Sequence, residues 1–176
     1  MRTFIGLGGN IGDARSTFAS AVAELRALGA IGAVSSLYVS EPRDVHDQPE
    51  FTNAALELET ELEPGALLVA LKGIELRLGR DLDGRRWGPR TIDLDILAFD
   101  GRCVEDPELE LVVPHPRLPQ RRFVLEPLAE LDPDFKPWRN CSDLRHDVTV
   151  GDLLPSVAEQ PVRRIGGADW ADPRPV

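Results

Sequence analysis

The spacing of apolar residues along the first hundred positions predicts four extended segments. Short apolar runs over residues 3–7, 33–40, 51–60 and 91–99 are typical of strands. The third run alternates, with Ala54, Leu56 and Leu58 on one face. The fourth, which includes Ile92, Leu94, Ile96, Leu97 and Phe99, is so apolar that we expect a central, buried strand.

Two helices are predicted between these strands. The first follows a capping residue at Asp13 or Ser16 and ends before Gly29. The second begins at Pro64, a residue suited to the first helical turn, and ends before Gly79. Their apolar stripes are Phe18, Ala21, Val22, Leu25 and Leu28 in the first helix, and Leu67, Leu68, Leu71, Ile74 and Leu78 in the second. Glu75 falls within the second stripe and should be partly sheltered.

The order of these elements predicts an α+β fold. Strand, helix, strand, strand, helix and strand suggest a ferredoxin-like βαββαβ plait, an antiparallel sheet with helices packed on one face. Residues 109–113 should be extended, and residues 123–131 and 149–154 helical. We expect a single domain over residues 1–160 and an irregular C-terminal tail over residues 161–176.

Composition restricts the class of protein. Hydrophobic residues make up 42% of the chain and charged residues 28%, as in soluble globular proteins. No apolar run approaches the roughly 18 residues of a membrane helix. The net charge of −10 argues against a nucleic-acid partner. Cys103 and Cys141 are far apart and form no CxxC pair, so we expect free thiols in a reducing cytoplasm.

Positive charge is nevertheless concentrated in one segment. Five of the 20 basic residues fall within residues 77–90, namely Arg77, Arg80, Arg85, Arg86 and Arg90. An acidic protein that gathers arginine in one place can bind a small polyanion there. A solvated helix end followed by a loop explains the same pattern, and this observation alone does not separate the two.

Asp93 and Asp95 form the most informative pair. On a strand, residues two apart face the same side at about 6–7 Å, and two carboxylates at that distance repel by about 2–3 kcal/mol. A cation offsets this cost, and Mg²⁺ prefers oxygen ligands, water and a substrate phosphate. We therefore favour a magnesium site over a structural pair bonded to nearby arginines.

The residues around Asp93 and Asp95 indicate a phosphate-binding site when they are taken together, although each one alone has a simpler structural explanation. Arg90 can fork onto a phosphate or hold a carboxylate, and Trp87 can stack on a heterocycle or fill a hydrophobic gap. His115 stands between two prolines and precedes Arg121, so it could donate to a phosphate, although a lone histidine is more often a packing residue. The chain contains no P-loop motif.

The glycines of residues 6–12 suggest a dinucleotide-binding loop, but their spacing argues against one. A Gly-x-Gly-x-x-Gly pattern that begins at Gly6 requires glycine where Ile11 stands. This loop more plausibly lets the backbone approach another segment or a ligand closely.

Four blocks together resemble a known family, the 6-hydroxymethyl-7,8-dihydropterin pyrophosphokinases of folate biosynthesis. The blocks are residues 6–10, residues 36–38 leading into 47–54, residues 86–95, and residues 113–116 through 121–123. They cover about residues 3–131. The resemblance implies transfer of the two terminal phosphates of ATP, as a unit, to the hydroxymethyl group of a reduced pterin, with release of AMP.

The resemblance also implies a set of site residues. Two Mg²⁺ ions would be held by Asp93 and Asp95. The catalytic residues would be Arg80, Arg90, Asp93 and Asp95. Pterin contacts would come from Ser40, Glu41, Pro42, Arg43, Phe51, Asn53, Trp87 and Phe123. ATP contacts would come from Glu75, Arg80, Arg86, Trp87, Arg90, Ile96, His115, Pro116 and Arg121. The partners would be ATP and the pterin, and the protein would be a monomer.

Several positions depart from the family pattern. Leu82 and Asp83 stand where some members have more basic residues, and Glu110 stands where some have arginine. Residues 40–44 lack a glycine common in the pterin loop, and we expect Asp44 to alter the flexibility of this loop. Two other functions remain open: a different magnesium-dependent nucleotidyl- or phosphotransferase on a similar plait, and a nucleotide- or pterin-binding module without catalysis. Retention of Asp93 and Asp95 argues against the module.

Overall fold

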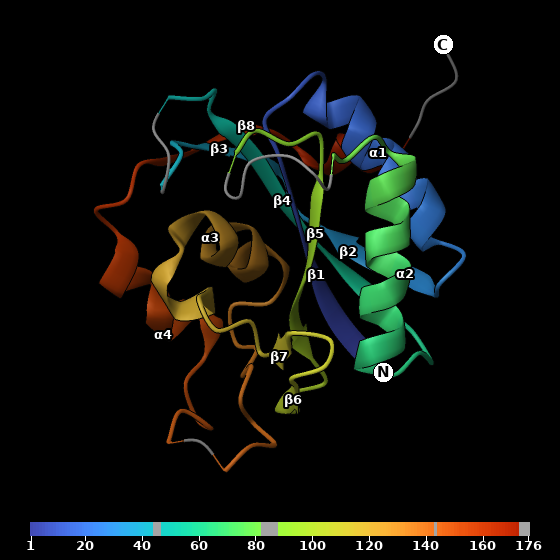
Figure 1. The fold of residues 1–176 in the computed structure, drawn as a ribbon. Coiled ribbons are helices and arrows are strands. Elements are labelled where there is room, and N and C mark those ends of the chain that lie inside the picture. The colour runs from blue at the N-terminus through green and yellow to red at the C-terminus, as the bar shows by residue number, and fades with distance from the viewer. Residues whose placement is uncertain (44–46, 82–87, 143, 173–176) are drawn as a thin grey trace.

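A six-stranded antiparallel sheet forms the centre of the computed structural model, which describes residues 1–43, 47–81, 88–142 and 144–172 (Figure 1). The strands run in the order β5-β1-β4-β3-β8, and β2 pairs with β4 beside β3. They are β1 (Arg2–Gly9), β2 (Ala30–Val34), β3 (Leu37–Ser40), β4 (Phe51–Glu59), β5 (Asp93–Phe99) and β8 (Val162–Gly166). A separate hairpin consists of β6 (Val104–Asp106) and β7 (Leu111–Val113). The predicted mixture of helices and antiparallel sheet is confirmed.

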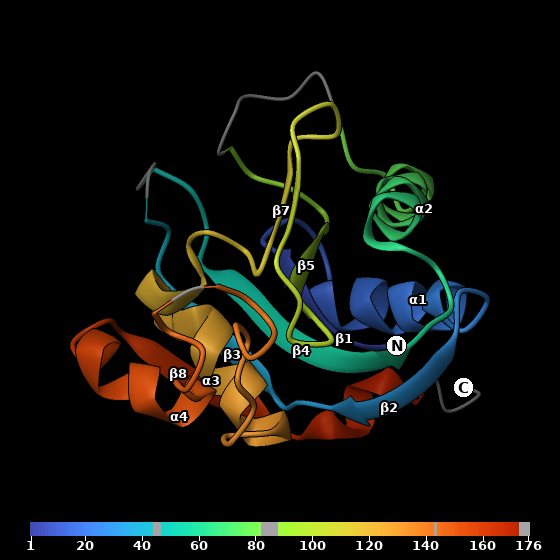
Figure 2. The same ribbon diagram turned by 90° about the horizontal axis from the view of Figure 1, so that it is seen from below.

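Helices cover both faces of this sheet (Figures 1 and 2). The helices are α1 (Ala14–Leu25), α2 (Pro64–Arg77), α3 (Arg122–Leu131) and α4 (Val150–Leu153), with short 3₁₀ turns η1 (Leu118–Gln120), η2 (Leu154–Val157) and η3 (Ala168–Ala171). Asp13 caps α1 as predicted, since its side chain accepts from the Arg15 N–H. Within the part of the chain that is described, no helix is long and apolar enough to cross a membrane.

The expectation of helices on one face is wrong. Ile5 and its face pack with α1 and α2, whereas Phe4 and the opposite face pack with α3 and α4. Successive strand residues point to opposite faces, so a strand apolar on both sides needs cover on both. A continuous apolar run in such a strand indicates cover on both faces but does not say which helices supply it.

The predicted strand over residues 33–40 is two strands. Val34 pairs with Leu56, whereas Tyr38 pairs with Asn53, and two buried serines separate the pieces. Ser35 bonds Ala55 twice, through its backbone N–H at 2.9 Å and its hydroxyl at 2.9 Å. A side chain therefore replaces one ladder bond at the break.

The strand with the two aspartates lies at the edge of the sheet. Among the described residues β5 pairs with β1 on one side and with no strand of this sheet on the other, so the expected central position is wrong. Its apolar side chains are nonetheless buried, because α2 and β7 pack against it. Burial on both faces makes an edge strand look central in the sequence.

Part of the expected irregular tail is ordered structure. Within the predicted tail, residues 162–166 form β8, which pairs with β3. Trp170 is 1% exposed, packs edge-on against Phe18 at 5.9 Å, and donates its indole N–H to the Ser35 carbonyl at 2.8 Å. The exposed Arg163 and Arg164 break any apolar alternation, which is why the pattern gave no strand signal.

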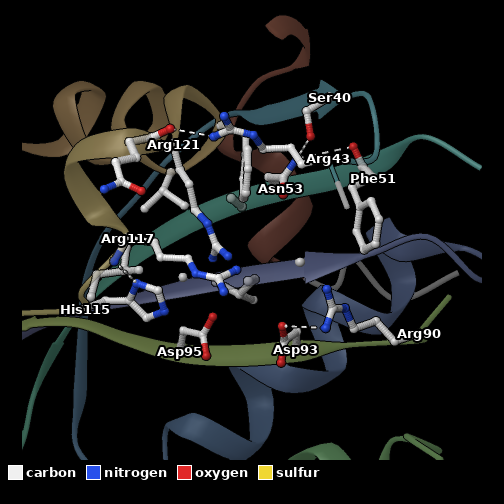
Figure 3. A pocket seen from close by; sticks show the side chains of 18 of the residues that line it. Ser40, Arg43, Phe51, Asn53, Arg90, Asp93, Asp95, His115, Arg117 and Arg121 are labelled. Carbon is white, nitrogen blue, oxygen red and sulfur yellow. Dashed lines mark hydrogen bonds and ion pairs between the residues drawn. The ribbon is translucent and has the colours of Figure 1, made fainter. Parts of the chain in front are cut away.

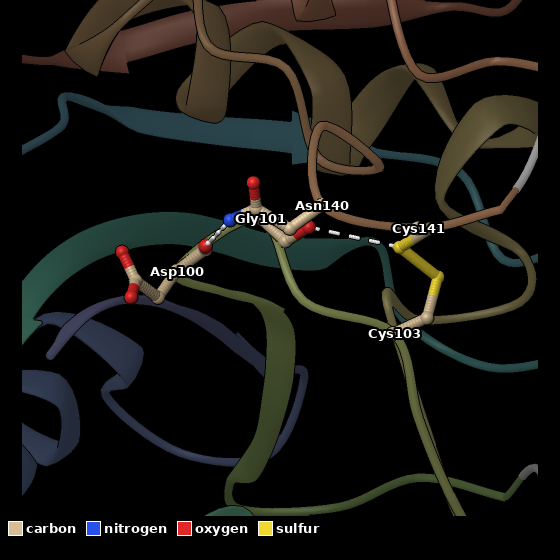
Figure 4. The surroundings of a disulfide bond; sticks show 5 residues. All are labelled: Asp100, Gly101, Cys103, Asn140 and Cys141. Carbon is tan, nitrogen blue, oxygen red and sulfur yellow. Dashed lines mark hydrogen bonds between the residues drawn. A yellow bond between two sulfur atoms is a disulfide. The ribbon is translucent and has the colours of Figure 1, made fainter.

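The two cysteines form a disulfide, so the expectation of free thiols is wrong. The sulfurs of Cys103 and Cys141 are 2.11 Å apart across a sequence separation of 38 residues (Figure 4). Asn140 supports the same junction, since its side-chain amide donates to the Asp100 carbonyl at 3.0 Å and its backbone N–H to the Gly101 carbonyl at 2.8 Å. Spacing along the chain carried no information on this contact, because tertiary structure brings the two segments together.

Candidate active site

A cavity of about 580 Å³ opens between the β5–β1–β4 part of the sheet and the start of α3. Side chains from strands, loops and the start of α3 converge on it (Figure 3). The lining includes these residues predicted for the site: Ser40, Glu41, Arg43, Phe51, Asn53, Arg90, Asp93, Asp95, His115, Arg121 and Phe123. Residues from four separate blocks of the sequence therefore surround one space.

The glycine-rich loop after β1 clamps the segment before β5. A side chain at Gly9 would place its Cβ 2.4 Å from the Thr91 carbonyl oxygen, so only glycine allows this approach. Asn10 donates its backbone N–H to the Arg90 carbonyl at 2.9 Å and accepts the Arg90 N–H on its side chain at 2.8 Å. Its side-chain amide also donates to Gln48 and to the Pro49 carbonyl, both at 3.1 Å. Asn10 thus joins the two loops that border the cavity, and the predicted close backbone approach is confirmed.

Asp93 is held by three cations. The Arg80 guanidinium bonds it directly, Arg90 lies 3.2 Å away, and the Lys72 ammonium 4.0 Å away. Burial by itself would raise the pKa of Asp93, but these three cations outweigh it and lower that pKa. Asp93 is therefore an anion that is neutralised within the protein.

Asp95 has the opposite electrostatic environment. Burial and the neighbouring Asp93 carboxylate raise the pKa of Asp95, and the nearby His115 opposes them only in part. In the β1–β5 register Asp95 pairs with Gly6 and Asp93 with Gly8, so no side chain of β1 stands opposite either carboxylate. A cation bound between the two carboxylates would relieve the cost of ionising Asp95.

These carboxylates fit the magnesium ions expected from the sequence. Both point into the cavity from alternate positions of β5 (Figure 3). Among the described residues, no group of three or more His, Cys, Asp or Glu could hold a metal by itself. Mg²⁺ commonly takes one or two carboxylates and completes its shell with water and substrate phosphates. The donor set is thus appropriate for a metal that arrives with a polyphosphate.

Two side chains of α2 bond the backbone N–H and C=O groups of β5 that no neighbouring strand reaches. Glu75, with 0% exposure, accepts the Leu94 N–H at 2.6 Å, and Lys72 donates to the Leu94 carbonyl at 3.2 Å and to Glu75 at 2.7 Å. Burial raises the pKa of Glu75 against the opposing pull of Lys72. The second Glu75 oxygen lies 2.7 Å from Arg80 but outside hydrogen-bond geometry. The expected shelter of Glu75 is confirmed, and its bond to Leu94 fixes the backbone between Asp93 and Asp95.

His115 is oriented by its own turn. The Val113–Pro114 bond is cis, the His115 N–H donates to the Leu97 carbonyl at 2.9 Å, and the Arg117 N–H donates to His115 Nδ1 at 3.1 Å. Because Nδ1 accepts, the neutral ring carries its proton on Nε2. Burial lowers the pKa of His115, Asp95 opposes this, and Arg121 and Arg117 add to the lowering. The ring is thus set to donate a hydrogen bond into the cavity.

The other half of the cavity carries aromatic and amide groups. Asn53 donates to Ser40 Oγ at 3.0 Å and to the Phe51 carbonyl at 3.3 Å. The Arg90 guanidinium lies 5.2 Å from the centre of the Phe51 ring, and that of Arg121 lies 5.5 Å from the centre of the Phe123 ring. This half offers flat apolar faces and an oriented amide, as a flat heterocycle requires.

Some predicted residues are not part of the lining. Pro42 and Glu75 are buried, and Pro116 is exposed. Arg80 pairs with Asp93 without lining the cavity, and Ile96 packs in the core on the other face. Arg86 and Trp87, like Asp44, Leu82 and Asp83, lie outside the described residues.

The structure adds lining residues that the sequence analysis did not name, among them Arg117 and Gln120. Both lie in the turn between His115 and Arg121, so their position in that motif was an available signal. Lys72 gave no such signal, because only the packing of α2 brings it to β5.

Paired carboxylates, arginines and a histidine around one cavity are groups that enzymes of phosphate transfer use to hold and neutralise a polyphosphate. Residues 4–133 match the model of the family described as 7,8-dihydro-6-hydroxymethylpterin-pyrophosphokinase (HPPK). A 2-amino-4-hydroxy-6-hydroxymethyldihydropteridine pyrophosphokinase of Pseudomonas aeruginosa is 40% identical over 169 residues, which cover 95% of this chain and 98% of the relative. The protein of the same name from Bacillus subtilis is 46% identical over 130 residues, covering 73% of this chain and 76% of the relative. The chain belongs to the HPPK family.

Solved structures show the same fold at low sequence identity. A crystal structure of Plasmodium falciparum HPPK-DHPS matches with a TM-score of 0.66 and 17% identity, over 88% of this chain and 45% of that chain. A second structure, described as HPPK-DHPS in complex with substrates, matches with a TM-score of 0.69 and 15% identity, over 88% and 43%. This chain spans less than half the length of those structures.

Proposed function

We propose that this protein transfers the terminal diphosphate of ATP to the hydroxymethyl group of 6-hydroxymethyl-7,8-dihydropterin, in folate biosynthesis. The hydroxyl oxygen attacks the β-phosphorus, the bond from that phosphorus to the α–β bridging oxygen breaks, AMP leaves, and the hydroxyl proton is released. Membership of the HPPK family and the names of its curated relatives support this activity. The observation that carries it is one cavity with paired carboxylates at one end and an aromatic–amide pocket at the other.

The carboxylate end would hold the triphosphate. Two Mg²⁺ ions, when bound at Asp93 and Asp95, would supply positive charge to the phosphate oxygens. Arg80 and Arg90, which now neutralise Asp93, would then be available to the phosphates, so that the pocket stays close to neutral. His115, with its proton on Nε2, and Arg121 add donors from the opposite wall. ATP contacts from Glu75, Arg86, Trp87, Ile96 and Pro116 remain proposals that rest on the family resemblance.

The aromatic end would hold the pterin. Phe51 and Phe123 would stack on the ring, and the Asn53 amide, oriented by Ser40, would bond its edge. Arg43 and Glu41 border this end, and Pro42 supports their loop from the interior. In-line transfer needs positioning and charge neutralisation more than covalent chemistry, and the two ends supply one each.

The decisive experiment follows each phosphate of ATP into the products. ATP labelled at the α, β or γ phosphate is incubated with Mg²⁺ and the pterin, with Asp95→Asn as the matched control. Transfer of both β and γ label to the pterin, with α label only in AMP, supports the proposal. Transfer of γ label alone, with ADP formed, would favour the different phosphotransferase. No transfer with normal pterin binding would favour the non-catalytic module.

Three further features are proposed on the same basis. We propose that β1, α1, β2–β3, β4, α2 and β5 form a ferredoxin-like plait, which the strand order β5-β1-β4-β3 supports. We also propose a cytoplasmic monomer, testable by sedimentation. Because a strongly reducing cytoplasm would open the Cys103–Cys141 disulfide, thiol labelling of protein taken directly from cells tests this proposal: two free thiols would support the cytoplasmic location, and an intact disulfide would count against it.

A further inference from the structure

The start of helix α3 forms one wall of the cavity, but its N-cap residue does not cap it with a side-chain hydrogen bond. Arg121 occupies the N-cap position, and Phe123 is the second residue of the helix. An arginine side chain has donors only, so it cannot accept the N–H groups that a helix leaves open at its start. Because Arg121 and Phe123 both line the cavity, the position of this helix start decides the shape of the site.

Gln160 supplies the missing acceptor from a distant part of the chain. Its side-chain oxygen accepts the Arg122 backbone N–H, the first of α3, at 2.9 Å. Its side-chain nitrogen donates to the Gln120 carbonyl at 3.0 Å. The amide orientation is determined by these partners, since a flipped amide would oppose one N–H donor with another. A single side chain therefore holds the residues on both sides of Arg121.

The same oxygen reaches the opposite border of the cavity. Arg43, from the loop after β3, points one guanidinium nitrogen at Gln160 Oε1, 3.3 Å away, and bonds the Gln120 carbonyl with the same nitrogen. Figure 3 shows the Arg43 side chain extended from the Ser40 side toward the start of α3. Gln160 and Gln120 thus fasten the β3–β4 loop to α3 across the aromatic end of the cavity.

The segment around Gln160 is itself anchored. The Arg122 guanidinium donates to the Ala158 carbonyl at 2.6 Å and to the Gln160 carbonyl at 3.0 Å, and the Gln160 N–H donates to the Val157 carbonyl at 3.0 Å. Val157 is 5% exposed and packs in the core beneath α3. Gln160 is therefore a fixed point rather than a side chain that happens to touch the site.

We propose that Gln160, which lies beyond the residues matched by the family model, is a positioning residue for the pterin half of the cavity. It sets the start of α3, with Phe123, against Arg43 and thereby fixes the width of the aromatic end. This inference rests on the proposed function, because its readout is the affinity for the pterin. It predicts that the C-terminal extension affects the pterin more than ATP, because Arg121, which lies between the two bonds of Gln160, is only one of several donors proposed for the triphosphate.

The test compares Gln160→Met, Gln160→Glu and the exposed neighbour Glu159→Gln in the full-length protein. Gln160→Met keeps the size but removes both polar groups, whereas Gln160→Glu keeps the acceptor for Arg122 and Arg43. We expect Gln160→Met to raise the pterin KM by about fivefold to tenfold, with a clearly smaller change, about twofold to threefold, in kcat and in the ATP KM, which Arg121 links to the same helix start. Gln160→Glu keeps only the acceptor half of these bonds and sets an oxygen against the Gln120 carbonyl, so its pterin KM should lie between those of wild type and Gln160→Met, and Glu159→Gln should behave as wild type.

The outcomes separate this inference from the proposed function. A wild-type protein that makes no pterin diphosphate would overturn both. Normal wild-type turnover with an unchanged pterin KM in Gln160→Met would overturn the inference alone. Equal losses in kcat and both KM values, together with a lower thermal midpoint, would also overturn it, because that pattern describes a purely structural residue. Should Gln160→Met fail to fold, Gln160→Asn, which is one methylene too short to reach both sides, takes its place with the same expectation.

A double-mutant cycle locates the effect. If Gln160 acts partly through Arg43, then Gln160→Met should change the pterin KM less in an Arg43→Met background than in wild type. Fully additive effects would contradict this route.

Discussion

Two aspartates separated by a single residue should respond to the same substitution with stability changes of opposite sign. Asp95→Asn removes a carboxylate whose pKa is raised by burial and by Asp93. Asp93→Asn removes one whose pKa is lowered by Arg90, Arg80 and Lys72. We expect the metal-free protein to gain stability from Asp95→Asn and to lose it from Asp93→Asn.

The magnitudes follow from geometry. Two charges at about 6–7 Å repel by about 2–3 kcal/mol at an effective dielectric constant near 20. Partial neutralisation of Asp93 and exposure to solvent reduce this, so Asp95→Asn should gain about 1–2 kcal/mol at pH 7. Asp93 is 19% exposed and Arg80 20%, so the loss of that pairing in Asp93→Asn should cost about 1–3 kcal/mol.

The stability contributions of the two aspartates should also change with pH in opposite directions. Folding raises the pKa of Asp95, so its contribution is present below the unfolded value, about 3.9, and is lost as pH rises through the folded value. The gain from Asp95→Asn should therefore grow with pH over that range. Folding lowers the pKa of Asp93, so its contribution is present above about pH 3.9 and is lost as pH falls through the folded value.

Urea unfolding in EDTA from pH 3.5 to 8 measures these changes, and unchanged m-values confirm that the midpoints report stability. Asp95→Asn should also lower kcat by about three orders of magnitude, since loss of metal charge at the transferred phosphate costs about 4 kcal/mol. If Asp95→Asn is as stable as wild type or less stable at pH 7, the two carboxylates do not repel as argued.

Three other regions yield predictions. Trp170→Ala should destabilise the protein by about 3–5 kcal/mol in thermal or urea unfolding, because it empties a buried site outside the family match; a change below about 1 kcal/mol would show that the tail is dispensable. Replacing Cys103 and Cys141 together by serine should cost about 4 kcal/mol, from the loop entropy of a 38-residue separation; an unaltered urea midpoint would contradict this. Arg121→Gln should raise the pKa of His115 in an NMR titration, because Arg121 lowers it; an unchanged or lower pKa would remove that coupling.

The sequence predicted elements whose signals are local. The helix beginning at Pro64 is confirmed, and its end is marked by Gly79, which has a positive φ of 85°. The Asp13 cap and the strands β1, β4 and β5 lie close to their predicted bounds. In each case the signal, whether a cap, a glycine after the helix or a short apolar run, lies within a few positions, which is the range that a pattern can report.

Features set by long-range packing could not be predicted in this way. The edge position of β5 depends on which strand pairs with β1, and its outward N–H and C=O at Leu94 are satisfied by side chains from α2. The site residues likewise divide into those with a local sequence signal and those placed by long-range packing. Asp93 and Asp95 were found because the pair is a contiguous motif, whereas Lys72 and Gln160 act across 22 and 38 residues respectively.

The lining residues of the cavity fall into two groups, those inside the loop that the disulfide closes and those outside it. The closed ring from Cys103 to Cys141 contains His115, Arg121 and Phe123, whereas Asp93 and Asp95 lie on the open chain before it. When the oxidised chain unfolds, the three ring-borne groups stay within a restricted volume, while the carboxylates are free to diffuse away. The complete site therefore requires the tethered loop to meet strands of the open chain, which carry Phe51 and Asn53 as well as the two carboxylates.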